Sequence, residues 1–128
     1  SPHVRVTRLP DECMGCYDAS TDTIWLDDRL TGPEHRCTLA HELVHAERQD
    51  QPLGNPDLSA KREVVVHREA ARRLISVDQL ADAVAWAAEA RELADCLDVD
   101  LPTLQARLDV LSDAERDYLE TITSRRDC

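Results

Sequence analysis

The sequence predicts a mainly helical α+β fold that has a small N-terminal β-sheet or hairpin and a C-terminal helical hairpin. Apolar residues make up 42% of the 128 residues, but aromatic residues make up only 3% and phenylalanine is absent. A core built from Leu, Val, Ile and Ala suits packed helices. Strand-like alternation is confined to the first 27 residues, and helix caps and helical periodicity occupy the rest.

Two segments near the N-terminus have the composition of β-strands. Residues 3–9 alternate between apolar and polar positions until Pro10, and residues 23–26 combine β-branched and aromatic side chains. The stretch 18–22 between them is rich in turn-forming residues. We therefore expect a β-hairpin that ends near Asp27.

Helical signals begin directly after this region. Thr31 is a good N-cap, Pro33 fits the first turn and Glu34 completes a capping box, so a helix is predicted over about residues 33–48. The following segment, 49–58, contains Pro and Gly and predicts a loop. Similar patterns predict the later helices, over residues 58–75, 77–90, 92–110 with a break at 98–102, and 113–125.

No internal repeat, low-complexity tract or long linker divides the chain. Its 128 residues are the length of one domain. We therefore expect a single compact domain, in which residues 1–76 form the core and residues 77–128 form a helical extension packed on that core.

Charge and cysteine content restrict the partners and the location. Fifteen basic residues against twenty-six acidic ones give a formal net charge of −11, which disfavours nucleic acid as a partner. No stretch reaches the ~18 consecutive apolar residues of a membrane span, and no signal-peptide pattern is present. An odd, scattered set of cysteines predicts reduced thiols and a cytoplasmic location. They are Cys13, Cys16, Cys37, Cys96 and Cys128.

The segment His41-Glu42-Leu43-Val44-His45 contains the pattern His-Glu-x-x-His inside a predicted helix. A spacing of four puts His41 and His45 on one face, where both imidazoles can bind one Zn²⁺ ion. Glu42 is rotated by roughly 100° from His41, so it can reach a zinc-activated water as a general base. This pattern is a metalloprotease signature. It predicts His41 and His45 as metal ligands and Glu42 as the catalytic residue.

A third metal ligand is expected from the next helix. The candidates are Glu63, His67 and Glu69. Glu63 and His67 are four residues apart and share a face, whereas Glu69 projects to the opposite side with two arginines. We favour Glu63 as the ligand and His67 as a group that holds a ligand in place, with His67 as ligand remaining an alternative.

These residues resemble those of the ImmA/IrrE-type metallopeptidases of bacteria, phages and mobile elements. Residues 37–45 match the first motif of that family, and Glu63 followed by residues 70–75 matches the second. The chain departs from the family at Val66, His67 and Glu69, where Ala, an Asp or Asn, and an aromatic residue are usual.

The resemblance covers about residues 3–76 and implies a zincin-like metallopeptidase core, in which a sheet edge lies beside the zinc helix. It also implies cleavage of a protein substrate in the cytoplasm, a repressor or another regulator of transcription. On such a fold, residues 23–26 would lie next to the site and an extended substrate could add to that edge. Ile24 or Trp25 would then shape a side-chain pocket, although Trp25 could equally be a core aromatic. His67, Tyr118 or an arginine could stabilise the transition state.

Two other patterns are weaker. Cys13 and Cys16 have metal-ligand spacing, but no second cysteine pair follows, so loop thiols are expected. Residues 92–108 resemble a helix-turn-helix, yet Asp98 replaces the usual turn glycine and Arg107 is the one cation of the second helix. The leading hypothesis is therefore a zinc metalloendopeptidase. The alternative is a helix-turn-helix-like regulator or a protein-binding module with a vestigial metal site.

Overall fold

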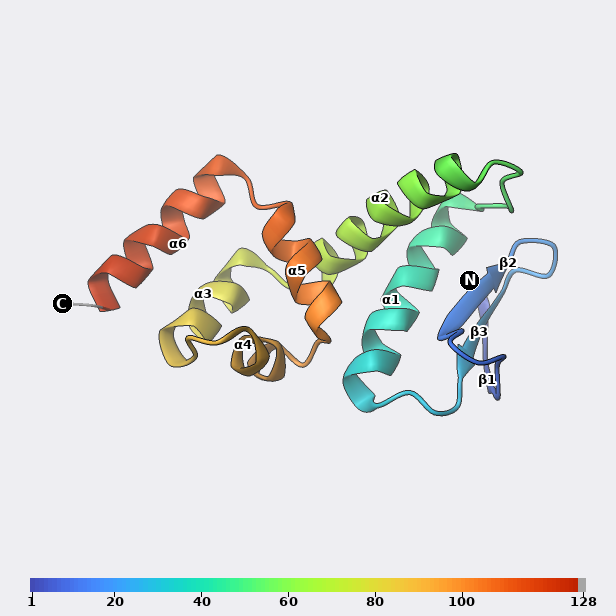
Figure 1. The fold of residues 1–128 in the computed structure, drawn as a ribbon, viewed down its shortest axis with the longest axis horizontal. Coiled ribbons are helices and arrows are strands. Elements are labelled where there is room, and N and C mark those ends of the chain that lie inside the picture. The colour runs from blue at the N-terminus through green and yellow to red at the C-terminus, as the bar shows by residue number, and fades with distance from the viewer. Residues whose placement is uncertain (127–128) are drawn as a thin grey trace.

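The computed structural model describes residues 1–126 and contains a small sheet followed by helices. The strands are β1 (His3–Thr7), β2 (Gly15–Asp18) and β3 (Thr23–Asp27). The helices are α1 (Gly32–Arg48), α2 (Pro56–Leu74), α3 (Val77–Trp86), α4 (Ala90–Leu97), α5 (Leu101–Asp109) and α6 (Asp113–Arg126). The sheet lies at one end of the molecule and α6 at the other, with α5 between them (Figure 1). The predicted mainly helical α+β fold is confirmed.

The sheet differs from the predicted hairpin in its strand pairing. Its strand order is β1-β3-β2, with β1 parallel to β3 and β2 antiparallel to β3. The prediction that residues 3–9 and 23–26 form a hairpin is therefore wrong. The antiparallel hairpin partner of β3 is β2, a strand that was not predicted. Strand β2 has the sequence Gly-Cys-Tyr-Asp, in which glycine and aspartate are poor strand formers. Cys16 consequently lies in a strand and not in a loop.

Helix α1 packs against one face of this sheet. Ile24 and Leu26 of β3 are fully buried and form a core cluster with Leu39 and Leu43 of α1. The two strand residues are two apart and therefore point to the same face. Helix α1 has the predicted capping box, in which Thr31 Oγ1 accepts from the Glu34 main chain and Glu34 Oε1 accepts from the Thr31 main chain.

Strand β2 approaches α1 closely at Gly15. A Cβ atom at this position would lie 2.7 Å from Thr38 Cγ2 and 3.0 Å from the carbonyl oxygen of Trp25. We expect Gly15→Ala to lower the free energy of unfolding by about 1–3 kcal/mol, because strand and helix must move apart. Urea denaturation measures this change. Gly54→Ala is the matched control, since its Cβ would meet nothing within 4 Å. Equal losses in both variants would contradict the prediction.

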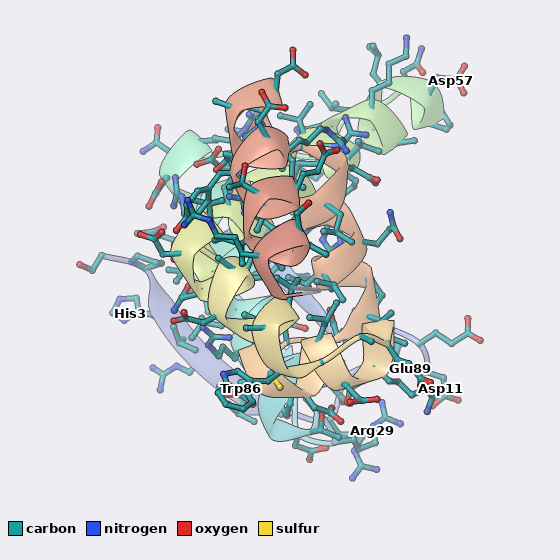
Figure 2. The ribbon with its side chains drawn as sticks, turned by 90° about the vertical axis from the view of Figure 1, so that its left-hand side faces the viewer. His3, Asp11, Arg29, Asp57, Trp86 and Glu89 are labelled. Carbon is teal, nitrogen blue, oxygen red and sulfur yellow. The ribbon has the colours of Figure 1, made fainter. Side chains whose placement is uncertain are left out.

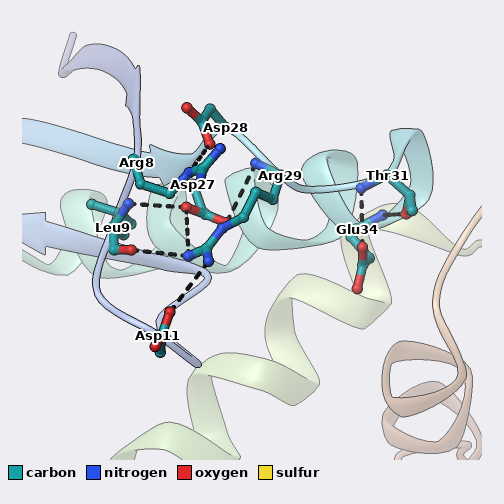
Figure 3. Close-up of polar contacts among 8 residues, drawn as sticks. All are labelled: Arg8, Leu9, Asp11, Asp27, Asp28, Arg29, Thr31 and Glu34. Carbon is teal, nitrogen blue, oxygen red and sulfur yellow. Dashed lines mark hydrogen bonds and ion pairs between the residues drawn. The ribbon is translucent and has the colours of Figure 1, made fainter.

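A network of charges closes the end of β3 before α1 begins (Figure 3). Asp27, with 6% of its side chain exposed, accepts from Arg29 Nε at 2.8 Å and from the main chain of Leu9 at 2.9 Å. Arg29 also donates to the Leu9 carbonyl oxygen at 2.9 Å. The hydrogen bond from Arg29, followed by that from Leu9, lowers the pKa of Asp27 from 3.8 to about 2.

Asp27→Asn is expected to destabilise the protein at neutral pH and to matter progressively less in acid. A lowered folded-state pKa gives stability that is fully present above pH 3.8 and is lost as the pH falls through about 2. The urea midpoints of the parent and the variant should therefore converge between those pH values. Asp28→Asn, at an exposed carboxylate bonded to Arg8, is the control and should change the midpoint less. A pH-independent difference for Asp27→Asn would contradict this account.

The remaining helices share a second core cluster. Its buried residues come from α1, α3, α4 and α5 and from the segments that follow α2 and α4: Cys37, Ile75, Leu80, Ala94, Val99 and Leu104. Helix α2 begins at Pro56, earlier than predicted, because the Asn55 side chain caps the main-chain amides of Asp57 and Leu58. Helix α3 ends at Trp86, earlier than predicted, because Ala87 is extended. Trp86 is exposed at that end (Figure 2).

No disulfide links the cysteines within the described residues. Cys13, Cys16, Cys37 and Cys96 are all free thiols, and Cys128 lies outside the described part of the chain. None of the helices in residues 1–126 combines the length and the apolar character that crossing a bilayer requires.

Candidate metal centre

Helix α1 presents both histidines of the His-Glu-x-x-His pattern on one face. The ring centroids of His41 and His45 are 5.0 Å apart and the ring planes meet at 64°. This placement follows from the helical spacing of four residues, which stacks the two side chains one turn apart. Their Nε2 atoms both face the N-terminal half of α2 through contacts with Glu63.

Glu63 of α2 contacts both rings with one carboxylate. Its Oε2 atom lies 2.7 Å from His41 Nε2, and its Oε1 atom lies 2.8 Å from His45 Nε2. Helices α1 and α2 can bring these groups together because small and branched residues fill the contact between them. These residues are Ala40, Val44, Val66 and Ala70. Two imidazole nitrogens and a carboxylate form a donor set that fits Zn²⁺ and similar divalent ions.

Glu42 points into the same site from the adjacent row of α1. Only 6% of the residue is exposed, and a carboxylate oxygen lies within 4.8 Å of ligand nitrogens of both histidines. Burial raises the pKa of Glu42 from 4.5 to about 7, with a further increase from Glu63 and an opposing effect of His45. Burial likewise lowers the pKa of His41, although the neighbouring Glu63 opposes that change. A neutral imidazole is the form that binds a metal ion.

Asp50 supports His45 from the side opposite Glu63. Asp50 Oδ2 accepts a hydrogen bond from His45 Nδ1 at 2.8 Å and another from Arg48 Nε at 3.1 Å. Burial would raise the pKa of Asp50, but the hydrogen bond from His45 and the charges of Arg48 and Arg62 outweigh it, so the pKa is lowered. The sequence reasoning missed this residue. The available signal was an acid five positions after His45, just beyond the helix end.

The other two candidates on α2 have different surroundings. His67 lines the cavity with its ring centroid 5.7 Å from that of His41, and its Nε2 donates to the Pro102 carbonyl oxygen at 3.1 Å. This contact ties α2 to the start of α5. Glu69 is paired with Arg72 and Arg73, as expected for a solvated charge, and does not line the cavity.

A cavity of about 620 Å³ surrounds these side chains. Its walls come from β2 with the preceding loop, from α1, from the loop after α1, from α2 and from the start of α5. Arg62 lines this cavity, where its Nη1 atom donates to the Gln51 carbonyl oxygen at 2.9 Å. Tyr118 instead donates to Asp78 on α3, which is not part of the cavity wall.

Ile24 and Trp25 do not line the cavity, contrary to the prediction. Ile24 is 0% exposed in the core between the sheet and α1, so a substrate cannot reach it. The predicted free edge at residues 23–26 is also wrong, because β3 is the central strand and is paired on both sides. The edge strand that reaches the cavity is β2.

The structure does not support DNA binding through the helix-turn-helix-like segment, because the one cation of its second helix is buried. Arg107 is 4% exposed and donates to the Ile75 carbonyl oxygen at 2.6 Å and to Glu115 at 2.9 Å. Its guanidinium group therefore closes the core between α5 and α6 and cannot contact a phosphate backbone.

The chain is similar to a known protein family over most of its length. The model of the family described as Peptidase_M78, IrrE N-terminal-like domain, matches residues 3–109. This match extends beyond residues 3–76, where the resemblance was seen, and includes α3, α4 and α5. No curated protein and no solved structure matches the chain.

Proposed function

The chain belongs to the Peptidase_M78 family of IrrE N-terminal-like domains, a metallopeptidase family, and on this premise we propose that it is a zinc-dependent endopeptidase. Its proposed reaction is hydrolysis of a peptide bond in a regulatory protein such as a repressor. The observation that carries the proposal is the single Glu63 carboxylate that meets both imidazole Nε2 atoms beside the buried Glu42.

The proposed metal ligands are His41, His45 and Glu63. All three offer nitrogen or oxygen atoms at the same point between α1 and α2. When bound there, a zinc ion would supply a Lewis acid that acidifies water and polarises a carbonyl group. His67 is proposed to support the site from the α5 side through its hydrogen bond to Pro102.

Glu42 is the proposed general base. Burial raises the pKa of Glu42 to about 7 in the metal-free site, and the charge of a bound cation would lower it again, which keeps the carboxylate ionised and able to accept a proton. We propose that a Glu42 carboxylate oxygen takes a proton from the attacking water and then gives it to the leaving amine nitrogen. Its burial limits competing contacts with bulk water.

The proposed substrate-binding edge is β2, in place of residues 23–26. The Asp27 main chain donates to the Met14 carbonyl oxygen at 2.9 Å, so Met14, Cys16 and Asp18 face β3 in the antiparallel ladder. By the same alternation, the main-chain groups of Gly15 and Tyr17 point away from β3. An extended substrate could pair with these groups across the cavity.

We also propose that residues 1–76 are the catalytic core and that residues 77–128 are an extension packed on it. The shared cluster joins Cys37 and Ile75 to Leu80 and Leu104. Arg36 of α1 adds a polar contact by donating to the carbonyl oxygens of Leu97, Asp98 and Leu74, which lie at the ends of α4 and α2. A cytoplasmic location is proposed on the free thiols and the nature of the substrate.

Zinc content and cleavage test the function together. We expect the purified protein to bind one zinc ion per chain and His41→Ala to bind much less, as measured by elemental analysis. The zinc-loaded protein should also generate new N-termini in a bacterial cytoplasmic extract, detected by mass spectrometry. A chelator should abolish these products and added zinc should restore them. A zinc-free parent protein, or products that persist with the chelator, would contradict the proposal.

A further inference from the structure

We propose that Asp50 is a positioning residue that holds the His45 ring with its Nε2 atom turned toward Glu63 and His41. This inference rests on the proposed function, because it assigns Asp50 a role only if His45 binds the metal ion. It concerns a residue outside the His-Glu-x-x-His pattern, and it is carried by the contacts that Asp50 makes in the turn after α1.

Asp50 contacts His45 at two points. Its main-chain amide donates to the His45 carbonyl oxygen at 3.0 Å, and its Oδ2 atom accepts from His45 Nδ1 at 2.8 Å. The first contact is possible because Gln49 adopts the left-handed conformation, with φ of 54°, and returns the chain toward the helix. The side chains of His45 and Asp50 are only 7% and 11% exposed. Backbone and side chain therefore fix this carboxylate relative to this ring.

Two arginines restrain the Asp50 carboxylate in turn. Arg48 Nε donates to Oδ2 at 3.1 Å from the last turn of α1, and Arg62 Nη1 lies 3.8 Å from Oδ1. Arg62 also donates to the Gln51 carbonyl oxygen at 2.9 Å, which fixes the next residue of the loop. Arg62 directly precedes Glu63 in α2. The same turn of α2 therefore supplies the Glu63 carboxylate at His45 Nε2 and restrains the Asp50 carboxylate at His45 Nδ1.

The chemistry of the ring explains why a carboxylate at Nδ1 matters. A metal ion takes the lone pair of one imidazole nitrogen, while the proton stays on the other nitrogen. Asp50 accepts a hydrogen bond from the protonated Nδ1 atom, so Nε2 is the nitrogen whose lone pair is available to the metal ion. The same hydrogen bond fixes the orientation of the ring and increases the basicity of Nε2. Without Asp50, His45 could rotate about χ2 or present the other tautomer.

Zinc affinity, measured by competition with a chromophoric chelator, tests this role in the full chain. Asp50→Ala is expected to weaken zinc binding by about 10–100-fold. Asp50→Asn should weaken zinc binding less than Asp50→Ala does. Its amide oxygen can still accept a hydrogen bond from His45 Nδ1, although it carries no charge. Glu47→Gln is the matched control, because it removes another arginine-bonded carboxylate of this region at an exposed site. It should stay within about twofold of the parent protein.

A second measurement separates positioning from a general effect on folding. In the zinc-loaded parent, the Nδ1 proton of His45 should give a protected signal in ¹H–¹⁵N NMR spectra, and Asp50→Ala should lose it. Circular dichroism of the zinc-free proteins shows whether each variant folds; if Asp50→Ala does not fold, Asp50→Asn decides. Parental affinity in the folded variant, or an unchanged Nδ1 signal in Asp50→Ala, would overturn the inference. Absence of zinc binding by the parent would instead overturn the proposed function.

Discussion

Glu42→Gln should reduce the rate of peptide cleavage by about 10²–10⁴-fold while zinc binding is retained. Glutamine has nearly the same shape as glutamate, but its amide cannot take a proton from water. The side chain is buried beside the two histidines, but Glu63 makes the contacts with both imidazole Nε2 atoms, so replacing Glu42 should leave the proposed donor set intact. The rate is measured as the accumulation of new N-termini in the extract, and the zinc content by elemental analysis.

Glu69→Gln is the control for this substitution. It makes the same chemical change on α2, at a partly exposed carboxylate that pairs with Arg72 and Arg73 away from the cavity. Its cleavage rate should equal that of the parent protein. Cleavage by Glu42→Gln at the parental rate would show that another group accepts the proton, and loss of zinc from this variant would place Glu42 among the ligands.

The helices and the centre of the site were predictable because their signals are local. The capping box of Thr31 and Glu34 lies within four residues, and the spacing of His41 and His45 places them on one face in any α-helix. Glu63 required one further step, since its choice depended on which face of α2 meets α1. The structure packs that face through Val66 and Ala70, which brings the carboxylate to both rings.

The sheet could not be predicted in the same way, because strand pairing is not local. Residues 3–9 and 23–26 have the composition of strands, but nothing in that composition specifies a parallel pairing. The short β2 has too few apolar positions to be recognised, yet it forms the edge beside the cavity. The errors at Ile24 and Trp25 follow directly, since the assignment assumed that their strand had a free edge.

Asp50 was missed for a related reason. Its position depends on a left-handed Gln49, and sequence rules expect glycine or asparagine where a helix ends in that conformation.

The family match extends to residue 109, and the structure shows why residues beyond 76 belong to the same unit as the site. Asp100, Pro102 and Thr103 at the start of α5 line the cavity beside His67, so the wall of the site includes residues well beyond the resemblance at 3–76.

Glu63→Ala is expected to weaken zinc binding by more than about 100-fold. Loss of a residue that only supports a metal ligand weakens binding by about 10–100-fold, and loss of a ligand should cost more. The substitution removes the carboxylate that lies 2.7 Å from His41 Nε2 and 2.8 Å from His45 Nε2. Two imidazoles alone would remain, and protein zinc sites of the catalytic type have three protein ligands. Chelator competition measures the affinity, with Glu69→Ala as the control on the same helix.

The ordering of three variants on α2 distinguishes the candidate ligands. If Glu63 is the third ligand, Glu63→Ala should lose far more affinity than His67→Ala, and Glu69→Ala should resemble the parent protein. The His67 ring already donates from Nε2 to the Pro102 carbonyl oxygen, so its loss should loosen the contact with α5 more than it changes the donor set. A larger loss in His67→Ala than in Glu63→Ala would assign the ligand to His67, and the Glu63 carboxylate would then only bridge the histidines. If Glu69→Ala lost the most zinc affinity of the three, α2 would have to turn its opposite face toward α1. The burial of Val66 and Ala70 against α1 opposes that arrangement.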